Sequence, residues 1–210
     1  MDARDEVLRR VRDATADVGD GAAAWDPADA TYDRDPQVDD PAALLAARVE
    51  DFSATVTRVE RGGVADAVAA VAARQGARRL ATARGLEPAW LPDGLELVEE
   101  PELSVEELDA VDGVITGCAL AIAATGTFVL DGGPGQGPRR LTLVPDLHVC
   151  LVREDQVVPG VPQAVAALRD AAAAGRPLTF VSGPSATSDI ELDRVEGVHG
   201  PRRLEVVLVG

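Results

Sequence analysis

Apolar and polar positions along the chain form short blocks that change between a strand period and a helical period. Runs of Val, Leu and Ile predict strands at 55–59, 79–82, 95–98, 114–116, 128–130, 140–144, 149–152, 178–181 and 204–209. Apolar residues at helical spacing predict helices at 2–18, from Pro41 to 52, at 64–74, 105–110 and 161–174, and a shorter helix at 119–124. The blocks alternate from residue 55 onward.

This alternation is typical of an α/β protein with a mostly parallel sheet and helices on both faces. Four predicted strands between residues 114 and 152 have little helix between them, which indicates an antiparallel or mixed portion. The polar segment 19–40, rich in Ala, Asp, Gly and Pro, is expected to be an extended linker. We therefore divide the chain into N-terminal helices and linker, 1–54, and an α/β domain, 55–210.

Charge and hydropathy exclude several classes of partner. The 210 residues carry a formal net charge of −16, so the chain lacks the positive field that binds phosphate backbones or anionic membranes. No apolar run approaches the ~20 residues of a membrane span, and the charged N-terminus lacks the apolar core of a signal peptide. We expect a cytoplasmic protein. The excess of acidic residues has two possible explanations: it keeps the protein soluble, or it forms a docking face for a basic partner.

Cysteine usage limits the cofactor chemistry. Cys118 and Cys150 are the only two cysteines, and no CxxC or Cys/His spacing of a metal site occurs. Both lie in apolar surroundings, which favours inert buried thiols. We therefore expect no cofactor bound by this chain alone and no metal site.

Three segments combine glycines with hydroxyl or cationic side chains, as anion sites do. They are Ala-Thr-Gly-Thr at 124–127, the glycine-rich loop with two arginines at 131–140, and Ser-Gly-Pro-Ser onward at 182–191. Each has a plainer alternative: a turn, a mobile hairpin loop, or a helix capped by Ser185. The ligand-binding candidates are Thr125, Gly126, Thr127, Arg139, Arg140, Ser182, Gly183, Ser185 and Thr187.

The candidate catalytic residues are the two histidines, His148 and His199, and the carboxylates Asp189 and Glu191. A histidine beside carboxylates can act as a general acid or base near neutral pH, whereas the alternative is a histidine that completes a loop hydrogen bond. We expect the loops around positions 126, 139, 185 and 199 to meet at the carboxyl end of one sheet, where open α/β sheets bind ligands. They would form a pocket for a small anion.

Five segments together resemble the lactate utilization protein C (LutC) family of LUD-domain proteins. They are Ala-Ile-Ala-Ala-Thr-Gly-Thr at 121–127, Leu-Val-Pro-Asp-Leu-His-Val at 143–149, Ser-Gly-Pro-Ser at 182–185, Asp-Ile-Glu at 189–191 and Gly-Val-His-Gly-Pro at 197–201. The resemblance covers roughly residues 110–210. It implies a Rossmann-like mixed sheet of the NagB/RpiA/CoA-transferase-like type. It also implies a role in oxidation of lactate to pyruvate with two partner proteins that carry iron–sulfur clusters.

The chain departs from that family at Ala124, where an acidic residue usually precedes Thr-Gly-Thr. Alanine cannot act as acid, base or nucleophile. We therefore expect an accessory subunit of an iron–sulfur L-lactate oxidation system that is not independently catalytic and binds a small carboxylate, a phosphate or a partner's cofactor. The alternatives are a stand-alone enzyme acting on a sugar phosphate, a CoA thioester or a folate, and a non-catalytic binding or regulatory module.

Overall fold

The structure, a computed structural model, describes residues 2–17, 36–100, 103–188, 194–196 and 199–210. The chain divides into two compact units, Met1–Asp33 and Arg34–Gly210. In the first unit, helix α1 (Ala3–Ala14) begins after Asp2, whose carboxylate accepts from the Arg4 amide. A helix is therefore confirmed over 3–14, and Val7 and Val11 are exposed on it.

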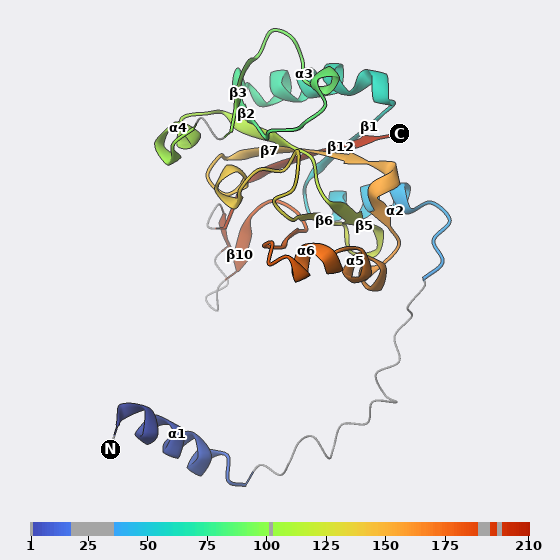
Figure 1. The fold of residues 1–210 in the computed structure, drawn as a ribbon. Coiled ribbons are helices and arrows are strands. Elements are labelled where there is room, and N and C mark those ends of the chain that lie inside the picture. The colour runs from blue at the N-terminus through green and yellow to red at the C-terminus, as the bar shows by residue number, and fades with distance from the viewer. Residues whose placement is uncertain (1, 18–35, 101–102, 189–193, 197–198) are drawn as a thin grey trace. The chain divides into compact units, whose positions relative to one another are not determined.

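The second unit is built on a six-stranded sheet in which every neighbouring pair is parallel (Figure 1). Its strands, in the order β1-β12-β7-β4-β2-β3, are β1 (Thr55–Val59), β12 (Arg203–Val209), β7 (Leu147–Arg153), β4 (Gly113–Thr116), β2 (Arg79–Thr82) and β3 (Glu96–Glu99). The two longest strands, β7 and β12, lie inside the sheet and are almost wholly buried. The predicted parallel sheet is confirmed.

Helices cover both faces of this sheet, as expected. Side chains alternate along β7, so that Val149 and Leu151 face helix α3 (Val64–Gln75) while Cys150 and Val152 face helix α2 (Pro41–Asp51). Helix α2 begins at Asp40, whose carboxylate accepts from the Ala43 amide at 2.9 Å, followed by a proline at the first helical position. Helix α3 ends at Gly76, where the left-handed backbone (φ 68°) suits glycine.

A second, smaller sheet packs below the first, on the same side as α2 (Figure 1). Its order is β8-β5-β6-β9, comprising β8 (Val157–Val158), β5 (Leu120–Ile122), β6 (Thr127–Leu130) and β9 (Thr179–Val181). The pairs β5–β6 and β6–β9 are antiparallel. The antiparallel portion expected from the sequence therefore exists, but it forms a sheet of its own and is not part of the central one.

Short elements complete the unit. Helices α5 (Val161–Ala167) and α6 (Arg169–Ala173) place Ala164 and Leu168 against the outer face of the second sheet. Helix α4 (Val105–Asp109) starts with a capping box between Ser104 and Glu107. The remaining elements are the hairpin β10 (Ala186–Ser188) and β11 (Arg194–Glu196) and the 3₁₀ helices η3 (Arg61–Gly63), η4 (Pro88–Trp90), η5 (Ala123–Thr125), η6 (Arg139–Thr142) and η7 (Glu154–Gln156).

Three predicted elements differ from the structure. The helix expected at 119–124 is strand β5 followed by η5, because small apolar residues fit equally well between two strands of a buried sheet. The strand expected at 140–144 is the 3₁₀ helix η6, which buries Leu141 completely and is followed by the exposed Leu143. The predicted single helix at 161–174 is two helices, α5 and α6. Within the part of the chain that is described, no helix is long and apolar enough to cross a membrane.

Candidate functional site

A cavity of about 300 Å³, which we call the Arg139 pocket, lies where β9 ends and where β7 and β12 begin. Its walls are the segments 179–185 and 199–201, together with Arg139, Thr142, His148 and Leu204. His148 and Leu204 are the second residues of their strands and lie opposite each other in the register. The pocket is therefore at the amino end of the central sheet, which corrects our expectation of its carboxyl end. Its volume is at the lower limit for small-molecule sites.

Arg139 supplies the positive charge of this pocket. Its Nη1 donates to the carbonyl oxygen and the Oγ1 of Thr142 at 2.9 and 3.1 Å, and its Nη2 donates to the carbonyl oxygen of His199 at 2.8 Å. No carboxylate among the described residues forms an ion pair with it. Partial burial lowers the pKa of Arg139, but a guanidinium stays charged at neutral pH. Neutral carbonyl partners fix the position of the cation without neutralising it.

Hydroxyl groups line the wall next to Arg139. The Ser182 Oγ lies 2.7 Å from the Thr127 Oγ1, which accepts in turn from the Thr125 Oγ1 at 2.8 Å. The single hydroxyl hydrogen of Thr127 can go to the Thr125 carbonyl oxygen, 3.3 Å away, or to Ser182; when it goes to Ser182, the Ser182 hydrogen is free to point into the pocket. The Ser185 Oγ accepts from the His199 amide at 3.0 Å, and the Ser185 amide donates to the Pro201 carbonyl at 2.7 Å. These bonds hold the two walls together.

His148 forms the floor of the pocket and is 2% exposed. Its Nε2 lies 2.7 Å from the Thr116 Oγ1, and its ring meets Phe128 edge to face at 5.7 Å. Burial, and secondarily the nearby charge of Arg139, lowers the pKa of His148 to about 3. The imidazole is therefore neutral at physiological pH and suited to hydrogen bonding, while the acid–base role remains a prediction.

The structure brings together some of the predicted site residues and separates others. Arg139, Ser182, Gly183, Ser185, His148 and His199 line the Arg139 pocket, and Thr125 and Thr127 reach it through Ser182. Gly126 lies instead against the backbone of Arg48 in α2, and Arg140 pairs with the buried Glu100. Asp189 and Glu191 lie outside the described residues, as does the side chain of Thr187. Of the four places expected to meet, 139, 185 and 199 do.

The glycine-rich loop lies at the carboxyl end of the central sheet, opposite the Arg139 pocket. The Gly117 amide donates to the Gly135 carbonyl at 2.6 Å, and the Gly135 amide donates to the Arg84 carbonyl at 2.8 Å. The buried Gln136 side chain bonds both the amide and the carboxylate of Asp131. These bonds tie the loop over the carboxyl ends of β2 and β4, so the glycines of the segment 131–140 and its two arginines do not surround one site.

Two polar residues of the site were missed from the sequence. Thr142 is 3% exposed and accepts from Arg139, and Thr116 is fully buried and contacts His148. A threonine at the end of an apolar strand, as in Gly-Val-Ile-Thr at 113–116, was the one signal available for Thr116. No cluster of three or more His, Cys, Asp or Glu side chains suited to a metal ion occurs among the described residues.

A parallel sheet covered by helices on both faces, with a polar pocket at its amino end, defines an α/β protein with a site large enough for a small ligand. The LUD domain family profile matches residues 64–209, most of this unit. The chain belongs to the LUD domain family.

Individual relatives agree with this assignment. "Lactate utilization protein C" of Deinococcus radiodurans is 50% identical over 164 residues, which cover 78% of this chain and 76% of that protein. The protein of the same name from Halalkalibacterium halodurans is 37% identical, and the alignment covers 52% of this chain and about half, 49%, of the relative. A crystal structure of a DUF162 family protein from Deinococcus radiodurans is similar with a TM-score of 0.71 and 38% identity, covering 86% of this chain and all of that chain. The resemblance to LutC proteins is confirmed.

Proposed function

We propose that this chain is an accessory subunit of an L-lactate oxidation system and that the Arg139 pocket binds a small carboxylate, either lactate or pyruvate. The observation that carries the proposal is the Arg139 guanidinium, which is held by neutral carbonyl groups at a pocket lined with serine hydroxyls. A carboxylate takes charge-assisted hydrogen bonds from a guanidinium. The hydroxyl of Ser182 or Ser185 suits the hydroxyl or keto oxygen beside it.

The names of the relatives support the metabolic setting, since they are called lactate utilization proteins. Oxidation of lactate to pyruvate releases two electrons, which a redox centre must accept. Cys118 and Cys150 are buried in the core, and the sequence has no cluster-binding cysteine motif. We therefore place the iron–sulfur clusters of the proposed system on partner proteins, with this chain presenting the carboxylate.

Replacement of Arg139 by methionine should weaken binding of L-lactate or pyruvate by about 10- to 100-fold, because a hydrogen bond to a charged group contributes roughly 1.5–3 kcal/mol. Arg139→Lys should show an intermediate loss, since an ammonium group cannot reproduce the planar fork. Isothermal titration at low ionic strength measures both affinities. Arg169→Met is the matched control, because Arg169 is an exposed cation outside the pocket and its loss lowers the net charge equally. Equal affinity in Arg139→Met and Arg169→Met would contradict the assignment of the pocket.

Deletion of the gene in its native host should impair growth on L-lactate and leave growth on glucose unchanged. A tagged copy should restore growth and co-purify with cysteine-rich iron–sulfur proteins, detected by the visible absorbance of their clusters. The Arg139→Met copy should co-purify equally but fail to restore growth, which separates carboxylate binding from assembly. Normal growth of the deletion strain on lactate would refute the metabolic role.

A further inference from the structure

A second cavity, of about 270 Å³, lies at the carboxyl ends of β2, β4 and β7, at the opposite end of the sheet from the Arg139 pocket. We call it the carboxyl-end cavity. From β2 the chain goes outward to β3 and then returns to β4 on the other side of β2, so the direction of winding changes between β2 and β4. The crevice at such a switch point is where open α/β sheets usually bind ligands. The residues after these two strands, Gly85 and Gly117, both line the cavity.

Backbone rather than side chains forms one wall of the cavity. Gly117 and Gly135 are joined by a hydrogen bond, and Gly85 has a left-handed backbone (φ 90°) beside them. A Cβ atom added at Gly85 would lie 3.3 Å from the Gly135 nitrogen, a tight contact at a backbone conformation that already disfavours a side chain. A Cβ at Gly117 would meet its neighbours at 3.6 Å or more, in ordinary contact. A ligand can therefore approach the backbone closely here.

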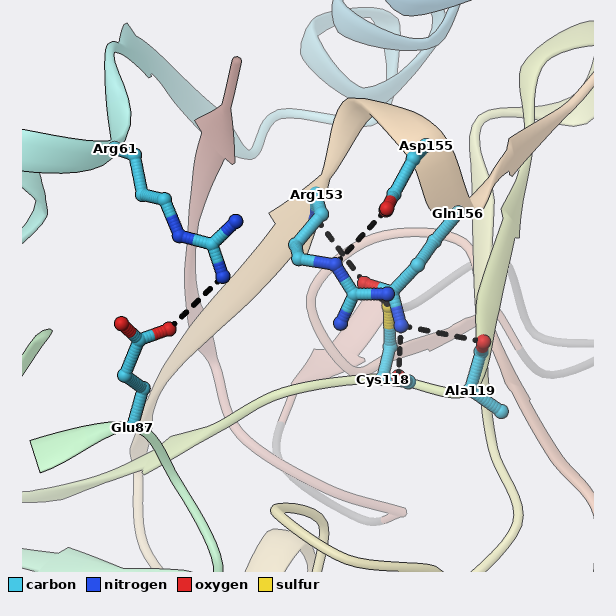
Figure 2. Close-up of polar contacts among 7 residues, drawn as sticks. All are labelled: Arg61, Glu87, Cys118, Ala119, Arg153, Asp155 and Gln156. Atoms are coloured by element: carbon cyan, nitrogen blue, oxygen red, sulfur yellow. Dashed lines mark hydrogen bonds and ion pairs between the residues drawn. The ribbon is translucent and has the colours of Figure 1, made fainter.

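Two guanidinium groups line the same cavity from different elements. Figure 2 shows Arg61 with its partner Glu87 on one side, and Arg153 with Asp155 on the other. Arg61 follows β1, and its guanidinium lies 5.6 Å from the centre of the Trp90 ring. Arg153 ends β7. Their carboxylate partners are exposed (side chains 41% and 72%), and such surface pairs contribute only ~0–1 kcal/mol, so ligand oxygens can replace them.

The wall beside Arg153 is held rigidly. The Gln156 side chain donates to the Cys118 carbonyl at 2.8 Å and accepts from the Arg153 amide at 3.1 Å (Figure 2). The apolar part of the lining comes from Leu86, Leu151 and Trp90. The Trp90 Nε1 is buried and has no hydrogen-bond acceptor among the described residues. Two cations, the carboxylate of Glu87, glycine backbone and an apolar patch thus surround one space on a chain whose net charge is −16, and a phosphoryl group there would take the place of the Glu87 carboxylate beside Arg61.

We propose that the carboxyl-end cavity binds a phosphate monoester, with the phosphoryl group between Arg61 and Arg153 and the rest of the molecule against Leu86 and Trp90. A phosphoryl group carries nearly two charges and three oxygens, which suits two guanidiniums approaching from different sides, whereas a carboxylate is matched by one. The site is distinct from the proposed lactate pocket. A nucleotide and a sugar phosphate share this chemistry.

Titration calorimetry of the full chain with inorganic phosphate, AMP and glucose 6-phosphate tests the proposal. At least one of the two esters should bind more tightly than inorganic phosphate, and the tighter ester identifies the source as a nucleotide or a sugar phosphate. Arg61→Met and Arg153→Met should each weaken that binding by about 10-fold or more. Gly117→Leu should abolish it by filling the cavity, while the melting temperature of the unliganded protein confirms that each variant is folded.

Arg139→Met is the control that separates the two sites. It should lose lactate binding and retain the phosphate ester, and Arg153→Met should show the reverse. Absence of ester binding, or unchanged affinity in both Arg61→Met and Arg153→Met, would overturn the proposal and leave the lactate assignment intact.

Discussion

Replacing Gly126 with alanine is expected to lower the free energy of unfolding by about 2–5 kcal/mol. Gly126 has a left-handed backbone (φ 61°), which costs a residue with a Cβ roughly 1–2 kcal/mol. An added Cβ would also lie 2.7 Å from the carbonyl carbon and Cβ of Arg48, so helix α2 would have to shift, at a further cost of about 1–3 kcal/mol. Urea unfolding followed by circular dichroism measures the loss.

Gly76→Ala is the matched control for that substitution. Gly76 has a similar backbone (φ 68°), but a Cβ there would meet no atom within 4 Å. It should therefore show only the conformational cost, about 1–2 kcal/mol. If the two variants lose equal stability, the close contact between Gly126 and α2 is wrong. A larger loss at Gly126 would show that the glycine of the Thr-Gly-Thr motif is needed for the close packing of α2.

Acidification should destabilise the protein through His148, by roughly 3 kcal/mol between about pH 6.5 and 4.5. The pKa of this side chain falls from its ordinary 6.5 to about 3 in the folded protein, mainly because the ring is buried. Between these values the unfolded chain binds a proton that the folded chain does not, so stability is complete above pH 6.5 and is lost as the pH falls toward 3. The free energy of unfolding at a series of pH values measures this slope.

His148→Gln should flatten that pH dependence, because glutamine can keep a hydrogen bond to Thr116 and does not titrate. Carboxylates also titrate in acid, so the comparison is between slopes and not between absolute stabilities. His199→Gln makes the same substitution at an exposed histidine, and the slope of His148→Gln should be flatter than that of His199→Gln. Identical slopes in the wild type and in His148→Gln would show that His148 is solvated.

The four inner strands of the central sheet, β12, β7, β4 and β2, could be predicted from sequence because they are short, apolar and mostly buried, and the edge strands β1 and β3 because each carries a short apolar run. Strand β5 could not, since Ala121 in a helix and Ala121 between β6 and β8 have the same sequence signature. Nor could the division into two sheets. Periodicity reports which residues are buried, whereas the partner of each strand depends on contacts between residues distant in the chain.

The same limit applies to the sites. The serines after β9 and Arg139 were identified from local composition, and they do line one pocket. The glycine-rich loop was also identified. Its hydrogen bond to Gly117 places it at the carboxyl end of the sheet, although Arg139, which follows the loop closely in the chain, lies at the amino end. Arg61 and Arg153 were not recognised, since a single arginine at the end of a strand has no distinguishing pattern. Their shared cavity arises from the parallel arrangement of β1 and β7.

Strand β7 runs from His148 in the Arg139 pocket to Arg153 in the carboxyl-end cavity. At about 3.3 Å per residue, these two positions are separated by roughly 15 Å of rigid, buried backbone. Occupants of the two sites could not touch, so no hydride, acyl or phosphoryl group could move from one to the other in a single step. Any communication between them would have to be a mutual change in affinity, equal in both directions.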